Sequence, residues 1–250
     1  MSSCPRLVAV VPARDEAPRI GRVVATMPPL VERILVVDDG STDDTAAVAR
    51  ASDPRVEVLC HPRSLGVGGA IVTGYLRARA LGADCAVVLA GDGQMDPRDL
   101  PAVVAPVLAG AADYVKGNRL AWPGGATAIP LDRLVGIIAL AAVTRWASGL
   151  RIDDAQCGYT AIGARALAAL EWADVWPGYG YPNDLLIRCA RAGLRVAEVP
   201  VRPVYDGAPS RLRLRHVPRI LRVIASARLG GAPVAALETR PCPRLPSTSG

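Results

Sequence analysis

The sequence predicts an α/β protein built on a single Rossmann-like, mostly parallel sheet with helices on both faces. Short runs rich in Val and Leu alternate with segments of helical periodicity, and almost every residue in these runs is apolar. Continuous apolar character is typical of parallel strands that are buried on both faces. The chain has 250 residues, which is enough for one sizeable domain. We therefore expect one doubly wound domain.

The first half of the chain alternates strands with helices. Ile20, Val23, Val24 and Met27 fall on one face of a helix. The two other helical stretches expected here are 68–82 and 97–110, each following a strand. The four predicted strands cover 7–13, 33–39, 56–60 and 85–91.

The second half is less regular. We expect a helix at about 130–148, a helix ending near residue 192 and a strand at 195–203. No linker separates the halves, so 1–230 is predicted to be one domain with halves at about 7–115 and 116–230. The Pro- and Ser-rich segment 231–250 is predicted to be a disordered tail.

Composition limits the possible functions. The net charge is +6, which fits an anionic small molecule or membrane face, but only 4% of residues are aromatic. Few aromatic residues argue against nucleic acid as a partner. Six cysteines without a C-x-x-C pair, together with two histidines, predict a reduced cytoplasmic protein without a zinc site. The longest apolar run, 134–144, is too short to span a bilayer.

Polar residues follow each of the four predicted strands. The segments are PARDEA (12–17), DDGSTDDT (38–45), HPRSLGVGG (61–69) and GDGQMDP (91–97). Parallel strands place their carboxyl ends at one edge of the sheet, where ligands bind. Acidic residues dominate three of the segments, which suits a divalent cation that bridges to a diphosphate.

These motifs resemble family 2 inverting glycosyltransferases of the GT-A fold. Within that family they look most like the dolichyl- and polyprenyl-phosphate sugar synthases. The resemblance covers roughly residues 7 to 225. The segments that carry it are VPARDEA, VVDDGSTDDT, HPRSLGVGGA, LAGDGQMDP, GNR (117–119), DDAQCGY (153–159) and GYGYPNDLL (178–186).

The resemblance implies a hexosyltransferase that uses a UDP- or GDP-linked sugar and Mg²⁺ or Mn²⁺. Residues 7–115 would form the nucleotide-sugar half. Asp92 and Gln94 would be the metal ligands, although Ala90 replaces the first Asp of the family's D-x-D motif. The donor-binding residues would be Pro12, Ala13, Asp15, Glu16, Asp39, Gly69, Asp92 and Gly93.

The second half would bind the acceptor. A polyprenyl phosphate is already anionic and needs arginines, whereas a soluble hydroxyl acceptor needs a general base. Both readings stay open, and the resemblance favours the lipid phosphate. Besides Asp92, the catalytic candidates are Asp154 and Asp184, as possible bases. The candidate acceptor arginines are Arg119, Arg133, Arg211 and Arg213.

Several alternatives remain at this stage. A nucleotidyltransferase or a non-catalytic nucleotide-sugar binder could share the sheet. Asp96 before Pro97 is interpreted as a helix N-cap. The arginine-rich segment 210–231 is either an ordinary solvated helix face or an interfacial helix that contacts the cytoplasmic face of a membrane.

Overall fold

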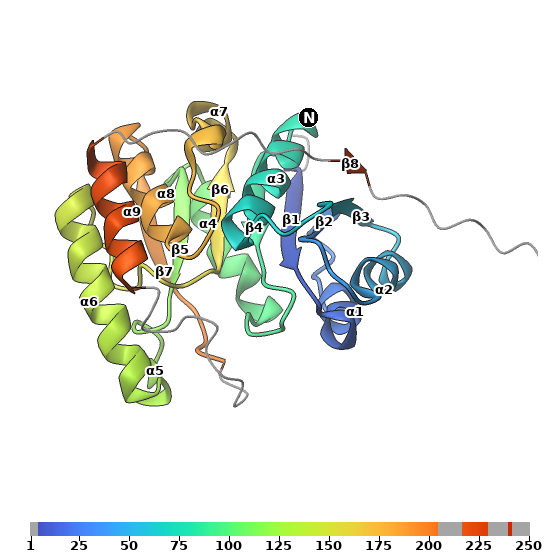
Figure 1. Ribbon diagram of the computed structural model, residues 1–250, viewed down its shortest axis with the longest axis horizontal. Coiled ribbons are helices and arrows are strands. Elements are labelled where there is room, and N and C mark those ends of the chain that lie inside the picture. Colours follow the sequence, from blue (N-terminus) through green and yellow to red (C-terminus); the bar gives the residue numbers. More distant parts are fainter. Residues whose placement is uncertain (1–4, 205–216, 230–239, 242–250) are drawn as a thin grey trace, which may run out of the picture.

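The computed structural model describes residues 5–204, 217–229 and 240–241. Within them one eight-stranded sheet has the order β7-β5-β6-β4-β1-β2-β3-β8. Figure 1 shows the strands side by side across the molecule, from β7 and β5 on the left to β2 and β3 on the right. The predicted α/β architecture with a mostly parallel sheet is confirmed.

The four predicted strands of the first half are present and parallel to one another. The fourth is shorter than expected, because regular pairing stops at Val88. The chain nevertheless continues beside β1, since the Gly91 amide donates to the Pro12 carbonyl over 3.2 Å. The strands are β1 (Leu7–Ala13), β2 (Arg33–Asp38), β3 (Val56–Cys60) and β4 (Cys85–Val88).

The second half adds three strands, of which only β7 (Val196–Pro200) was expected from the sequence. β5 (Tyr114–Asn118) runs parallel to β7, and β6 (Thr160–Gly163) lies antiparallel between β5 and β4. The sequence did not predict β5 because three of its residues, Lys116, Gly117 and Asn118, are not apolar. All three are nevertheless buried. β8 (Arg240–Pro241) pairs antiparallel with β3. The rest of the predicted tail, 231–239 and 242–250, lies outside the described residues.

Helices cover both faces of the sheet (Figure 1). The first face carries α1 (Ala17–Ala25), α2 (Thr45–Ser52) and α4 (Leu100–Leu108). The second carries α3 (Val67–Ala80), α7 (Ala164–Ala169) and α8 (Tyr181–Arg191). The remaining described helices are α5 (Gly125–Ala128), α6 (Leu131–Ser148), α9 (Val217–Leu229) and the 3-10 turns η1 (Pro97–Asp99) and η2 (Trp172–Asp174).

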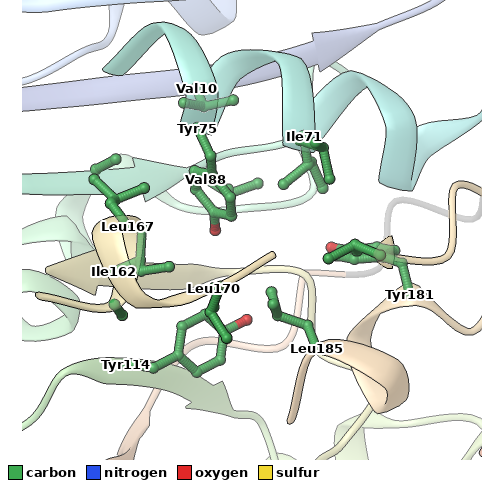
Figure 2. Close-up of a cluster of buried hydrophobic side chains, with 14 of the residues drawn as sticks. Val10, Ile71, Tyr75, Val88, Tyr114, Ile162, Leu167, Leu170, Tyr181 and Leu185 are labelled. Atoms are coloured by element: carbon green, nitrogen blue, oxygen red, sulfur yellow. The ribbon is translucent and has the colours of Figure 1, made fainter. Parts of the chain in front are cut away.

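The hydrophobic core joins the two halves of the chain. Figure 2 shows Tyr75 of α3 in the same cluster as Tyr114 of β5 and Leu185 of α8. Alternate residues of β1 point to opposite faces, so Val10 belongs to this cluster and Val11 to the core beneath α1 and α4. Residues of both halves therefore pack together on each face of the sheet.

Helix α9 packs against α6 and α8. Its apolar side, Ile220, Val223, Ile224 and Ala227, is buried there. Leu221 and Leu229 are exposed together with arginines such as Arg222. The four buried apolar residues are therefore unavailable to a membrane, and an interfacial role for segment 210–231 stays a prediction that would use the exposed side of α9.

Candidate active site

The structure brings the exits of β1, β2 and β4 to one edge of the sheet. Ala13 at the end of β1 lies opposite Asp38 of β2, and Gly91 after β4 reaches the Pro12 carbonyl. A Cβ added at Gly91 would lie 3.1 Å from the Ala13 Cβ and 3.2 Å from the Pro12 oxygen. Glycine at this position therefore lets the two segments approach closely. The predicted donor-binding segments share this edge, as expected.

Asp15 and Glu16, both predicted to bind the donor, differ sharply in exposure. Asp15 is exposed, in the left-handed region with φ of 53°. Its Oδ1 accepts from the Thr42 amide at 2.8 Å, which fixes the loop after β2. The Glu16 side chain is buried and pairs with Arg19 over 3.0 Å. Of the two residues, only Asp15 lies at the surface.

Asp39 organises the loop after β3. Its Oδ1 lies 2.7 Å from His61 Nδ1 and accepts from the Leu65 amide at 2.7 Å. Its Oδ2 accepts from the Ser64 hydroxyl at 2.7 Å and the Gly66 amide at 2.9 Å. Burial alone raises the pKa of Asp39, but these hydrogen bonds outweigh burial and lower it. Its contact with the donor base or ribose stays a prediction, because the chain already uses both oxygens.

Gly69, another predicted donor residue, contacts the second half of the chain. Its amide donates to the Pro177 carbonyl at 3.1 Å. A Cβ at Gly68 would collide with the Trp176 carbonyl. These glycines let the loop at 176–178 lie against the start of α3. The Gly69 amide thus joins the two halves of the chain, and its donor contact stays a prediction.

Asp92 lies half-buried at the same edge as Pro12 and Ala13. Its Oδ1 accepts from the Gln94 amide at 3.0 Å, and Gly93 between them has φ of 79°. Among the described residues, no group of three or more His, Cys, Asp or Glu side chains is arranged to hold a metal ion. One carboxylate still fits Mg²⁺ or Mn²⁺, because such ions bind through one or two carboxylates plus substrate phosphates.

Asp96 is a structural cap, as its position before Pro97 predicted. Its Oδ1 accepts from the Arg98 amide at 2.9 Å at the start of η1. Arg202 reaches its Oδ2 at 3.4 Å and Asp99 Oδ1 at 2.9 Å. These contacts tether the segment after Asp92 to the exit of β7. Both oxygens of Asp96 are thus engaged by the chain itself.

Arg119 follows β5 and is held by Asp154. The guanidinium donates to both carboxylate oxygens, at 2.7 Å and 2.9 Å. Asp154 is fully buried, whereas 21% of the Arg119 side chain is exposed. Burial alone raises the pKa of Asp154, but Arg119 outweighs it and lowers the pKa. Arg119 thus lies over Asp154, and a role for Asp154 as a base that faces the acceptor stays a prediction that this pairing disfavours.

Sequence reasoning missed two ionisable neighbours of this pair, of which Lys116 is buried and Glu198 is half-buried. Lys116 is fully buried and donates to the Cys157 carbonyl, and burial lowers its pKa. Glu198 of β7 accepts from the amides of Asp153 and Asp154, each at 2.9 Å. Burial raises the pKa of Glu198. Lys116 could have been singled out because it is the one lysine of the chain. Nothing in the sequence around Glu198 indicates that it lies beside Asp154.

Asp184 sits in the first turn of α8, inside the protein. Its Oδ2 accepts from the Trp176 amide at 2.7 Å and pairs with Arg188 at 3.0 Å. Burial raises the pKa of Asp184 in spite of these partners. Neighbouring Asn183 is also buried and bonds to Gln156 and Thr144. Asp184 thus closes the 176–184 loop and presents only 2% of its surface to solvent.

Among the other predicted acceptor arginines, Arg133 is described and half-buried. It precedes Ile137 by four residues and so shares the inner face of α6, against the rest of the fold. Arg211 and Arg213 lie outside the described residues. Arg119 and Arg133 both lie close to the start of α6 in the sequence, on either side of α5.

Comparisons with known proteins agree with these motifs. Residues 8–167 match the family model described as "Glycosyl transferase family 2". The UDP-N-acetylglucosamine–dolichyl-phosphate N-acetylglucosaminyltransferase of Methanococcus voltae is 30% identical over 78% of this chain and 84% of its own length. The undecaprenyl-phosphate mannosyltransferase of Micrococcus luteus is 32% identical, covering 78% of this chain and 82% of that protein.

A solved structure resembles almost the whole chain. Glucosyl-3-phosphoglycerate synthase from Mycobacterium tuberculosis, crystallised with Mn²⁺, UDP and glucosyl-3-phosphoglycerate, has a TM-score of 0.65 and 26% identity. The match covers 95% of this chain and 90% of that one. The GT-A architecture expected from the sequence is thereby confirmed.

Proposed function

The chain belongs to glycosyl transferase family 2, and we propose that it moves a sugar from a nucleotide-diphosphate sugar to a polyprenyl phosphate, inverting the anomeric centre. The family sets aside the nucleotidyltransferase and non-catalytic alternatives. The two relatives described above transfer sugars to dolichyl or undecaprenyl phosphate. Their similarity extends over most of this chain, including much of the acceptor half.

We favour a phosphate acceptor because both candidate bases, Asp154 and Asp184, are buried. A hydroxyl nucleophile needs a base within hydrogen-bond reach. Asp154 is covered by Arg119, and Asp184 is held by Arg188 and the Trp176 amide. Neither carboxylate is free to accept a proton from an acceptor. A phosphate nucleophile is already ionised at neutral pH, so it does not need a general base.

Arginines in the same half fit an anionic acceptor. Asp154 holds the Arg119 guanidinium through two hydrogen bonds while leaving part of it exposed. A guanidinium fixed in this way can bind phosphate oxygens with little loss of side-chain entropy. Arg133, on the inner face of α6, is the second candidate. Arg211 and Arg213, outside the described residues, complete the proposed acceptor set.

On the donor side, Pro12, Ala13 and Asp15 would line the nucleotide site, and Asp92 with Gln94 would approach the diphosphate. A bound Mg²⁺ or Mn²⁺ would neutralise the charge that develops on the leaving diphosphate. With Ala90 in place of a carboxylate, Asp92 is the main protein ligand available. We therefore expect weak metal binding in the absence of donor and stronger binding when the diphosphate supplies additional oxygens.

A soluble phosphorylated acceptor is the second candidate. The synthase with the similar structure was crystallised with glucosyl-3-phosphoglycerate. Fixed arginines would bind such a molecule as readily as a lipid phosphate. It would still need a base for its hydroxyl, which is why we rank it second.

The test is a panel of UDP- and GDP-linked sugars assayed with two acceptors, a short-chain polyprenyl phosphate and 3-phosphoglycerate. Release of nucleoside diphosphate is followed together with the mass of the glycosylated product. We expect transfer to the polyprenyl phosphate and not to 3-phosphoglycerate. Transfer only to 3-phosphoglycerate, lost in Asp184→Asn, would replace our proposal with the second candidate.

A variant in the acceptor half localises the effect. Arg133→Ala should abolish transfer to the polyprenyl phosphate while slow hydrolysis of the donor persists, because donor and metal contacts lie in the other half. Arg22→Ala, on exposed α1, is a matched control that removes an arginine elsewhere. Equal transfer by both variants would remove Arg133 from the acceptor site.

A further inference from the structure

Helix α6 has a second apolar face that points away from the protein. Its inner residues, including Leu140, are buried against α8 and α9. Nine large apolar side chains are exposed in the described residues, and four of them lie on this helix. They are Leu131 (75% exposed), Val135 (59%), Ile138 (51%) and Trp146 (68%). The spacing places all four in one stripe opposite the buried side.

Helix α9 lies beside α6 (Figure 1) and extends this surface. Leu221 of α9 is 41% exposed. It precedes Arg228 by seven residues and shares the side of α9 on which Arg228 reaches α6. We call Leu131, Val135, Ile138, Trp146 and Leu221 the α6–α9 surface. An exposed apolar face on a helix whose other face is already buried indicates a contact with a partner or a membrane.

The charges around this surface are mostly basic. Helix α6 carries Asp132 and Arg133 in its first turn, no further charged residue before Arg145, and α9 contains arginines but no acidic residue. Arg228 lies with its guanidinium carbon 4.3 Å from the Trp146 ring centroid and donates to the Trp146 carbonyl at 2.8 Å. Arginine and tryptophan at the border of an apolar stripe are typical of proteins that lie in a lipid interface.

We propose that the α6–α9 surface docks on an anionic phospholipid bilayer. No helix among the described residues combines the length and apolar character needed to cross a membrane, so the helix would lie along the interface. The stripe supplies the apolar contact and the arginines contact lipid phosphates. The proposal rests on the polyprenyl-phosphate function, because such an acceptor is held in a bilayer.

The orientation that follows is compatible with catalysis. In Figure 1, the start of α6 lies at the same end of the molecule as the end of β1, which carries the donor residues. Arg133, on the first turn of α6 and on its inner face, would therefore lie at this end of the docked helix, on the side turned from the lipid toward the transfer site. A polyprenyl phosphate could present its headgroup there while its chain stays in the bilayer.

Sedimentation with vesicles, without donor or acceptor, tests the surface alone. The vesicles are phosphatidylcholine with or without about 30% phosphatidylglycerol. The variant Val135→Glu/Ile138→Glu places two charges on the stripe without reducing helix propensity. The matched control, Leu30→Glu/Leu108→Glu, changes two exposed leucines on other elements. Circular dichroism checks that both variants fold.

We expect the wild type and the control to bind anionic vesicles and to bind neutral vesicles more weakly. The α6 variant should lose about tenfold or more in vesicle affinity. Absence of wild-type binding, or equal binding by the α6 variant, would overturn the proposal. So would a wild-type dimer, seen by light scattering, that the variant dissociates when neither protein binds vesicles, because a second copy would then cover the face.

This readout is independent of sugar transfer. Vesicle binding without transfer to any polyprenyl phosphate would leave the surface standing and remove the proposed function. Transfer to a short-chain acceptor in solution without vesicle binding would do the reverse. With a long-chain acceptor in vesicles, the α6 variant should transfer less sugar, but it should match the wild type on the short-chain acceptor.

Discussion

Asp39 of the donor half and the two predicted bases of the acceptor half, Asp154 and Asp184, are held in different ways. Asp39 lies beside His61 and accepts hydrogen bonds from the Ser64 hydroxyl and the amides of Leu65 and Gly66. Asp154 and Asp184 each bind an arginine side chain. Asp39 therefore orders a loop, whereas Asp154 and Asp184 fix guanidinium groups in place.

This difference matches the two substrates. A loop ordered by amides can follow the outline of a nucleotide while Asp92 at the strand exit approaches a metal-bound diphosphate. A guanidinium held by a buried carboxylate offers a fixed positive group to an acceptor phosphate. The physical cost also differs, because an arginine–carboxylate pair is more damaging to break from one side than a single neutral hydrogen bond.

The largest effect should come from breaking the Arg119–Asp154 pair. Arg119→Ala leaves Asp154 buried with amide hydrogen bonds and without its arginine partner, and we expect a loss of about 3–5 kcal/mol in the free energy of unfolding. Arg145→Ala is the matched control, because its partner Asp153 is 69% exposed and exposed pairs contribute about 1 kcal/mol or less. Urea unfolding measures both. Equal losses would show that burial does not distinguish the two pairs.

The next effect concerns catalysis in the donor half. Asp92→Ala should lower turnover by about 10²- to 10³-fold, as expected when a group that stabilises developing charge is removed. The melting temperature should hardly change, because Asp92 is only half-buried. Asp96→Ala, four residues on, should instead lose a helix cap worth about 1 kcal/mol and keep turnover. If Asp92→Ala retains the wild-type rate in both EDTA and Mn²⁺, the metal role is wrong.

The sequence was sufficient for the donor edge because its signals are local. Buried parallel strands read as continuous apolar runs, and parallel strands place their exits at one edge whatever their loops do. The positions of Pro12, Asp38 and Gly91 follow from that rule. The cap at Asp96 was equally local, since it depends on the proline that follows.

Local sequence patterns could not predict the acceptor half. β5 is buried although it contains Lys116 and Asn118, and it is stabilised by neighbours distant in the sequence. Asp154 looked like a surface base because its partners Arg119 and Glu198 lie 35 and 44 residues away. A motif gives the type of residue at a position but not the groups that the fold places against it.

The next prediction tests the role of Asp39 in ordering its loop. Asp39→Ala removes the acceptor of four contacts within the loop at 61–66. We expect a higher donor KM with kcat nearly unchanged, together with a lower melting temperature. Ser64→Ala removes one of these bonds and should cost about 1 kcal/mol of stability. An unchanged donor KM in Asp39→Ala, with the expected loss of stability, would leave Asp39 a purely structural role.

The smallest effect is in the pH dependence of stability. The pKa of Asp39 is lowered in the folded protein, so its contribution is present above the unfolded pKa and is lost as pH falls through the folded value. The pKa of Glu198 is raised by burial, so its contribution is present below the unfolded pKa and is lost as pH rises through the folded value. On acidification, the two residues therefore act in opposite directions.

Asp39→Asn should accordingly flatten the loss of stability between about pH 5 and pH 3, whereas Glu198→Gln should steepen the loss on acidification from about pH 7 to pH 4. Each change in slope is at most about 1.4 kcal/mol per pH unit, since one proton is involved. The measurement is the free energy of unfolding in urea across this range. If both variants shift the slope in the same direction, one of the two pKa assignments is wrong. A parallel profile for Asp39→Asn and the wild type would mean that the amides around Asp39 stabilise its neutral and charged forms equally.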